Sequence, residues 1–216
     1  MKRDFRGQDR PRYQDFSEAD RPRFDRSPPP RRADGPRPAP PRRPAPSAAP
    51  IGAETWHRPW VQMKYFSYNP GVFPRMIGAA SPDAAAGNLV AVYDRQGELF
   101  GQGFFNPDAR IPLRVLSHGP GAPSEDSLDA AIRTAVAMRR DFLKLHATTD
   151  AWRAVHSDAD LLGGIIVDKF ADVLSVEISN LGAWQRVERW LPLLHAELGT
   201  SRAVLHMDED VARYEG

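Results

Sequence analysis

The sequence predicts an α+β protein in which two small units follow one another along the chain, joined by a helix and preceded by an unfolded tail. Three observations carry this prediction. The first fifty residues contain twelve of the 21 prolines and thirteen Lys and Arg. From Trp60 onward, short β-type runs alternate with turn signals. Residues 124–148 then show the apolar spacing of an amphipathic helix.

The tail, residues 1–55, has almost no aliphatic side chains. Such a segment cannot bury enough apolar surface to offset its ordering entropy, so we expect it to be disordered. Its interleaved Arg and aromatic residues suit loose contacts with phosphates and unpaired bases. A purely solubilising tail is the alternative, and composition does not separate the two.

Charge is unevenly distributed, although the net charge is only +1. Residues 1–50 carry a net charge of +6, residues 51–146 carry +1, and residues 147–216 carry −6. A polyanionic partner would therefore meet the tail or the first folded unit, and the C-terminal part would repel it.

The sequence shows no apolar run of 18 residues and no secretory signal, which predicts a cytoplasmic protein without membrane contact. The acids and prolines of the tail argue against a transit peptide. The absence of Cys excludes disulfides, thiolate metal sites and a thiolate nucleophile within these residues.

Residues 56–123 are expected to form a small β-barrel. Asn88–Asp94 should pair with the following run through a hairpin that turns at residues 95–97. Gly101 and Gly103 lie two apart on one face of the returning strand and indicate a bulge or the close approach of another backbone. The other strands are expected at Val61–Phe66 and Ile111–Leu116.

Residues 124–148 are expected to form the connecting helix and to pack on the barrel. Ser124 or Ser127 supplies an N-cap, acids fill the first turn, and basic residues gather at the end. The apolar stripe consists of Leu128, Ile132, Ala135, Val136 and Phe142.

Residues 149–216 are expected to form a small α+β unit of the strand-strand-helix-strand type. Two strands pair across a turn at Lys169–Asp172, and a helix from Trp184 to Leu198 follows, which Pro192 kinks or splits. A last strand is expected at Ser201–Met207, with no regular element after it.

One stretch stands out as a candidate binding surface, "GFFNPDARIPLRVL" from Gly103 to Leu116. Phe104 and Phe105 should point to opposite faces of a strand, so that one of them is core. Arg110 and Arg114 lie four apart on a predicted strand and should project to the same side, where they could straddle RNA phosphates or remain solvated.

The "HSDAD" stretch places His156, Asp158 and Asp160 on one face of an extended segment, as in a hard-metal or acid/base site. We favour a turn in which Asp caps backbone N–H groups, and interpret "HMDED" (His206–Asp210) in the same way. The tryptophans expected in the core or at an interface are Trp60, Trp152 and Trp184.

Two stretches together resemble a known family. "GQGFFNPDARIPLRVL" and "SYNPGVFPRMIG" resemble the two halves of a PUA domain (pseudouridine synthase and archaeosine transglycosylase domain), a small barrel of RNA-modifying enzymes. The family usually has His-Pro-Trp-Val-Phe where this chain has residues 69–73. "RAVHSDADLLGGIIVDKFADVLSVEIS" resembles the segment that follows the PUA domain in large-subunit rRNA methyltransferases. Its motif positions fall on Asp160, Leu161, Gly164, Val167, Asp168 and Phe170.

The final "DVARYEG" resembles the Asp…Arg…Glu-Gly signature that leads, in that family, into an S-adenosylmethionine-binding Rossmann-type domain acting on cytosine C5. The resemblance implies that the chain stops before this domain, so that it binds no cofactor itself. The Gly163-Gly164 pair is expected to serve turn chemistry. The resemblance implies RNA contacts at Lys64, Arg75, Asn106, Arg110 and Arg114.

The leading hypothesis is therefore the RNA-docking front of an rRNA (cytosine-C5) methyltransferase, truncated or split, with ribosomal RNA as partner. A partner chain could supply the methyltransferase domain, and an oligomer is possible. The alternatives are a free-standing PUA-type RNA-binding protein without catalysis and an inactive fragment.

Overall fold

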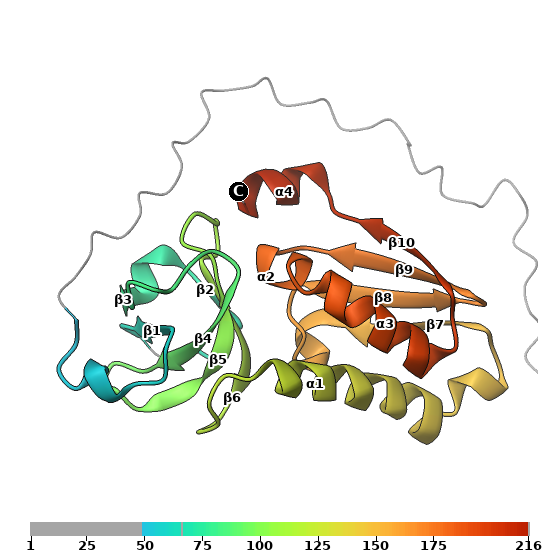
Figure 1. The fold of residues 1–216 in the computed structure, drawn as a ribbon, viewed down its shortest axis with the longest axis horizontal. Coiled ribbons are helices and arrows are strands. Elements are labelled where there is room, and N and C mark those ends of the chain that lie inside the picture. Colours follow the sequence, from blue (N-terminus) through green and yellow to red (C-terminus); the bar gives the residue numbers. More distant parts are fainter. Residues whose placement is uncertain (1–48, 66, 216) are drawn as a thin grey trace, which may run out of the picture. The chain divides into compact units, whose positions relative to one another are not determined.

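The computed structural model describes residues 49–65 and 67–215, and they form a mixed α+β fold built on two sheets (Figure 1). The first sheet has six strands in the order β2-β6-β5-β4-β1-β3. Its strands are β1 (Trp60–Met63), β2 (Gly71–Val72), β3 (Ile77–Ala80), β4 (Asn88–Tyr93), β5 (Leu99–Phe105) and β6 (Leu113–His118). All neighbours pair antiparallel except β1 and β4, which are parallel.

This sheet curls on itself because its two edge strands are also neighbours in sequence. A four-residue connection that contains the 3-10 turn η3 (Pro74–Met76) joins β2 to β3. Six flat strands would hold the edges about 24 Å apart, whereas five Cα steps span at most about 19 Å. The side chains enclosed by the curl form a core of their own: Val61, Met63, Val72, Ile77, Val90, Val92, Phe105, Leu113 and Val115.

Strand β5 confirms the predictions for its glycines and for the opposite faces of Phe104 and Phe105, but it corrects the prediction that only one of these rings is a core residue. A Cβ on Gly101 would meet the Ser117 carbonyl, and one on Gly103 would meet the Arg114 carbonyl, which confirms the close approach of β6. Phe104 and Phe105 point to opposite faces, but both are core residues. Phe105 belongs to the barrel core, whereas Phe104 packs into the core around the second sheet.

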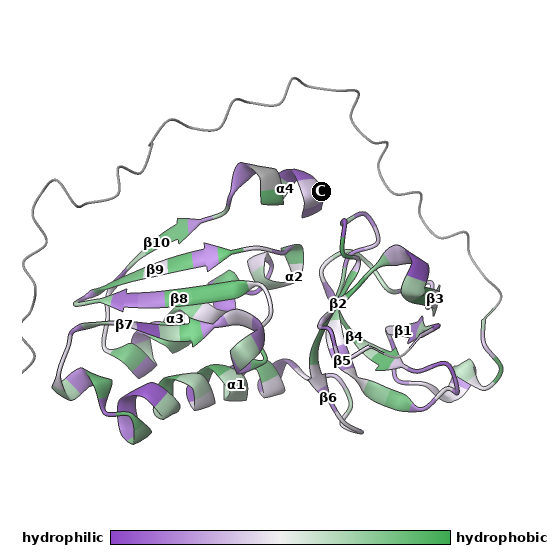
Figure 2. Ribbon diagram, turned by 180° about the vertical axis from the view of Figure 1, so that it is seen from behind, coloured by the Kyte–Doolittle hydropathy of each residue, from purple (hydrophilic) through white to green (hydrophobic). Residues whose placement is uncertain are grey.

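Helix α1 (Glu125–Ala137) begins at Ser124, whose side chain accepts a hydrogen bond from the Asp126 N–H at 3.2 Å. Its apolar and polar bands alternate in Figure 2. It packs on helix α3 (Val187–Leu198) and strand β7 (Ala151–His156), and not mainly on the barrel as predicted. A π-turn (Met138–Phe142) follows, and its wider spacing rotates Phe142 off the buried face, leaving that side chain 77% exposed.

The second sheet has the order β10-β9-β8-β7, with β8 (Ile165–Phe170), β9 (Val173–Ile178) and β10 (Arg202–His206). The predicted pairing of β8 with β9 is confirmed, with the turn at residues 171–172. Strand β10 runs parallel to β9, so a helical crossover joins them. Helices α1 and α3 cover the face on which Leu174, Val176 and Ile178 are buried.

The crossover differs from the prediction in where it breaks. Helix α2 (Leu181–Trp184) ends at Trp184 with Gln185 as its C-cap, and α3 begins at Val187 after Arg186. Pro192 lies exposed inside α3 and does not interrupt it. Trp184 is 46% exposed, whereas Trp60 and Trp152 are buried as expected, so the prediction for Trp184 was wrong.

The two ends of the described region also hold elements that were not predicted. Ala53–Thr55, the last residues of the predicted tail, form a 3-10 turn (η2) with Ala53 buried. Residues 209–215, expected to lack regular structure, form helix α4 (Glu209–Glu215). The prediction of disorder for residues 1–48 lies outside the described residues. Among the described residues, no helix is long and apolar enough to cross a bilayer.

Candidate nucleic-acid interface

Three cations surround the end of strand β1. The Lys64 N–H donates to the Met76 carbonyl at 2.7 Å, which fixes Lys64 beside η3 and its Arg75. The Gln62 side chain donates to the Arg95 carbonyl at 3.3 Å and so holds the β4–β5 turn against β1. We call Lys64, Arg75 and Arg95 the cationic rim; all three are exposed.

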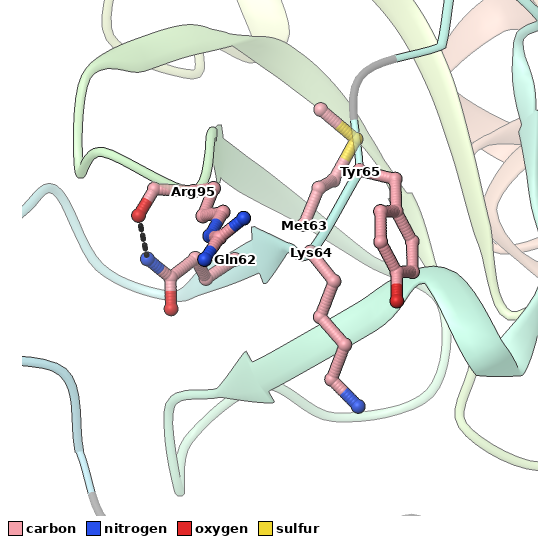
Figure 3. Close-up of a pocket in the computed structure, with 5 residues that line it drawn as sticks. All are labelled: Gln62, Met63, Lys64, Tyr65 and Arg95. Atoms are coloured by element: carbon pink, nitrogen blue, oxygen red, sulfur yellow. Dashed lines mark hydrogen bonds between the residues drawn. The ribbon is translucent and has the colours of Figure 1, made fainter.

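Two shallow hollows lie along the cationic rim. One of about 300 Å³ is lined by Gln62, Met63, Lys64, Tyr65 and Arg95 (Figure 3). In that view the Lys64 and Tyr65 side chains extend to the same side, whereas Met63 points the other way and is buried. The second hollow, of about 380 Å³, is lined by Phe73, Pro74 and Arg75. Both sizes lie at the low end of small-ligand sites.

The cationic rim differs from most other basic positions in its lack of counter-charges. Within the described residues, Lys64, Arg75 and Arg95 form no ion pair. The arginines that do pair with a carboxylate are Arg58, Arg114, Arg133, Arg139, Arg140, Arg153, Arg186, Arg189, Arg202 and Arg213. A paired guanidinium must exchange its carboxylate for a phosphate, so the rim is the surface best prepared to attract a polyanion.

Arg110 and Arg114 do not share a strand face, which corrects the predicted geometry. The Asn106 N–H donates to the Pro112 carbonyl at 2.7 Å and closes a loop, so Arg110 lies outside β6. The Arg110 guanidinium lies 6.0 Å from the centre of the Tyr214 ring of α4. Arg114 lies on β6 and pairs with Asp158 at 3.4 Å.

Asn106 is buried and holds helix α4 in place. Its side-chain N–H donates to the Glu215 carbonyl at 2.6 Å and to the Glu215 carboxylate at 3.4 Å. The same carboxylate accepts from the Leu181 N–H at 3.0 Å. Burial raises the pKa of Glu215 despite these hydrogen bonds. Asn106 therefore supports the loop, and sequence reasoning missed this role because it did not predict α4.

Asp160 of "HSDAD" caps a backbone N–H of the turn, as favoured from the sequence, whereas the Asp158 carboxylate pairs with Arg114. Ser157–Asp160 form a 3-10 turn, and the Asp160 carboxylate accepts the His156 N–H at 2.6 Å and pairs with Arg139 at 2.8 Å. Among the described residues, no group of three or more His, Cys, Asp or Glu side chains could hold a metal ion.

The glycine pair at 163 and 164 does not fit a nucleotide cofactor. A Cβ on Gly163 would meet the Asp158 side chain, and one on Gly164 would meet the Asn180 side chain. Asn180 also donates to the Gly163 carbonyl at 2.9 Å and caps α2. The space beside both glycines is thus filled by the protein, and these residues offer no cradle for S-adenosylmethionine.

Comparison with known proteins assigns the barrel to a class. Residues 57–118, which hold all six strands and the cationic rim, match the family model described as a PUA-like domain. The chain therefore contains a PUA-like domain, and the predicted PUA resemblance is confirmed at this level.

The longer matches concern rRNA methyltransferases, to which the chain is homologous. A ribosomal RNA large subunit methyltransferase of Deinococcus radiodurans is 26% identical over 148 residues, 67% of this chain and 36% of that protein. Ribosomal RNA large subunit methyltransferase I of Shewanella denitrificans is 30% identical over 118 residues, 52% of this chain and 28% of that protein. The chain thus spans about a third of the length of these relatives.

Solved structures support the fold alone. The crystal structure of SMU.776, a putative methyltransferase complexed with SAH, superposes with a TM-score of 0.55 at 15% identity. The match covers 70% of this chain and 41% of that one. A putative SAM-dependent methyltransferase from Streptococcus mutans gives 0.50 at 12% identity, over 67% and 40% of the two chains.

Proposed function

We propose that the described part of this protein docks ribosomal RNA for an S-adenosylmethionine-dependent methyltransferase acting on cytosine C5. The observation that carries the proposal is the cationic rim, whose three exposed side chains lie on a PUA-like barrel without carboxylate partners in the described residues. Homology to large-subunit rRNA methyltransferases supports ribosomal RNA as the ligand. Such a substrate agrees with the predicted cytoplasmic location.

The chain's own residues contribute binding and orientation, not methyl transfer. Methylation at C5 of cytosine needs a nucleophile that adds at C6, and no Cys occurs in the sequence. We assign methyl transfer to a Rossmann-type domain outside these 216 residues, in the same chain or in a partner. The net charge of −6 on residues 147–216 repels phosphate and so favours contact through the barrel.

The predicted RNA-binding residues differ in whether their side chains already have a partner in the protein. Lys64 and Arg75, together with Arg95, make the primary phosphate contacts. Arg110 adds a secondary contact, because it is exposed while it packs against Tyr214. Arg114 contributes only when RNA displaces Asp158, and Asn106 acts through the loop that it holds.

The test is the salt dependence of binding to a large-subunit rRNA fragment. Replacing Lys64, Arg75 and Arg95 together by Ala should reduce the slope of log affinity against log salt by about 2 to 3, since each phosphate contact contributes about 0.7 to 0.9. The matched control replaces Arg153, Lys169 and Arg202 by Ala, which changes the net charge equally on the second sheet.

The control should leave most of the slope intact. Equal losses in the two triple variants would show that only net charge matters and would contradict the assignment to the cationic rim. A wild-type chain that binds rRNA no better than a neutral protein of similar size would contradict the proposed function itself.

A further inference from the structure

Exposed aromatic rings accompany the cationic rim. Tyr65 is 60% exposed and lines the hollow that Lys64 and Arg95 share. Phe73 is 40% exposed and lines the hollow that contains Arg75. Single exposed rings are common on protein surfaces, but a ring beside a cation without an ion pair offers a ligand two kinds of contact in one place, stacking and charge.

The two hollows share one composition, a π-face next to a cation. In the first, the Tyr65 ring and the Lys64 ammonium extend to the same side of the chain (Figure 3). In the second, Phe73 and Arg75 flank Pro74 within one short turn. A ligand that fills both hollows would meet one aromatic ring and at least one cation in each of them.

Single-stranded RNA has this composition. An A-form duplex presents phosphates and sugars on its surface and keeps its base faces stacked inside, so it would use the cations but not the rings. Unpaired nucleotides use both, because every base has a π-face and every linkage has a phosphate. A basic proline-rich peptide, such as the chain's own first fifty residues with their net charge of +6, would be repelled by the rim.

We propose that this barrel surface binds single-stranded RNA, with unpaired bases stacked on Tyr65 and Phe73 and phosphates held by Lys64, Arg75 and Arg95. The inference rests on the proposed function and narrows its substrate to a loop or an opened strand. Stacking makes the surface selective for unpaired nucleotides, and the cations make it tolerant of sequence.

The experiment measures the affinity of the full chain for a 12-nucleotide RNA, the same strand with abasic sites, and the matching duplex. Tyr65→Ala and Phe73→Ala should each weaken binding of the intact single strand about 5- to 150-fold, the range found for base–aromatic stacking. Binding of the duplex and of the abasic strand should change less than about 2-fold. Tyr65→Phe, which keeps the ring, should restore binding of the intact strand.

Phe170→Ala is the matched control, because Phe170 is a 53% exposed aromatic on the second sheet. It should leave all three affinities unchanged. Equal losses for strand and duplex, or no loss in either ring variant, would overturn the inference. If the variant that replaces Lys64, Arg75 and Arg95 still binds both RNAs more weakly in that case, the proposed function is retained and only the inference is overturned. If the wild type binds neither RNA, both the proposed function and the inference are overturned.

A protein ligand is the remaining outcome to test. A synthetic peptide of residues 28–46 is the probe, since it is the proline-rich candidate within the chain. Binding of this peptide that is lost in both Tyr65→Ala and Phe73→Ala, with single-stranded RNA affinity unchanged, would assign the surface to peptide recognition and overturn the inference.

Discussion

Replacing Arg186 should weaken the contacts between the barrel and the second sheet with its helices, and so lower the free energy of unfolding. Arg186 lies between α2 and α3 and is only 11% exposed in its side chain. Its guanidinium contacts the Glu125 carboxylate of α1 at 2.5 to 3.0 Å and the Gly87 carbonyl of the barrel at 3.0 Å. It also lies 4.6 Å from the centre of the Phe104 ring. One side chain therefore joins three segments that are far apart in sequence.

The magnitude follows from these contacts. Arg186→Met keeps the length and apolar stem but removes the charge and its hydrogen bonds. Breaking a buried ion pair costs about 3 to 5 kcal/mol. The Glu125 side chain is 37% exposed and regains water, so we expect a smaller cost than that, about 2 to 4 kcal/mol. With a urea m-value of about 2 kcal/mol/M, the unfolding midpoint should fall by about 1 to 2 M.

Urea unfolding followed by circular dichroism and by Trp fluorescence provides the assay. Arg189→Met is the control, since Arg189 pairs with Asp129 at 2.7 Å but is 45% exposed, and this variant should shift the unfolding midpoint much less than Arg186→Met. A double-mutant cycle with Glu125→Gln should give a coupling of about 1 to 3 kcal/mol. Equal small costs for the two arginines, or no coupling, would refute the assignment of Arg186 as the junction residue.

Two further outcomes follow from the geometry. Gly103→Ala should destabilise the barrel by about 1 to 3 kcal/mol, because its Cβ would meet the Arg114 carbonyl, and thermal melting should separate it from Gly121→Ala, where the space is open. Glu215 has a pKa raised by burial, so its contribution to stability is greatest below the ordinary value of 4.5 and falls as pH rises through the raised pKa. Glu215→Gln should make the melting temperature less dependent on pH between 4.5 and the raised pKa of Glu215. An unchanged pH profile would contradict the burial of this carboxyl.

Local patterns predicted much of the fold. The hairpin at residues 95–97, the pair β8–β9 and helix α1 each depend on turn residues, alternation or capping within a few positions. Such signals act over the same short range as the structures they specify, which is why they sufficed.

Helix α4 was missed because its stabilising contacts are distant. It has only seven residues, too few to be stable without packing. It is held through Glu215 by Asn106, which lies 109 positions earlier, and by the N–H of Leu181. The same distance hid the role of Asn106, since a buried amide that anchors a remote helix has no local signature.

The division between available and neutralised arginines was hidden for a related reason. Arg114 and Asp158 are 44 positions apart, and Arg186 and Glu125 are 61 apart, so only the fold brings each pair together. A sequence count of basic residues treats all of them alike. The family resemblance predicted RNA contacts for Lys64 and Arg75. It did not predict one for Arg95, which was interpreted only as part of a turn.

The acidic residues Asp83 and Asp94 of the barrel interact with groups outside the cationic rim. Asp83 pairs with Arg58 at 2.8 Å, which lowers the pKa of Asp83 to about 2 and keeps it ionised and engaged. The Asp94 carboxylate accepts backbone N–H groups of its own turn, both at 2.9 Å. Within the described residues, the Asp83 and Asp94 carboxylates thus have partners outside the cationic rim, and neither forms an ion pair with Lys64, Arg75 or Arg95. RNA affinity should therefore depend on this local arrangement far more than on the net charge of the chain.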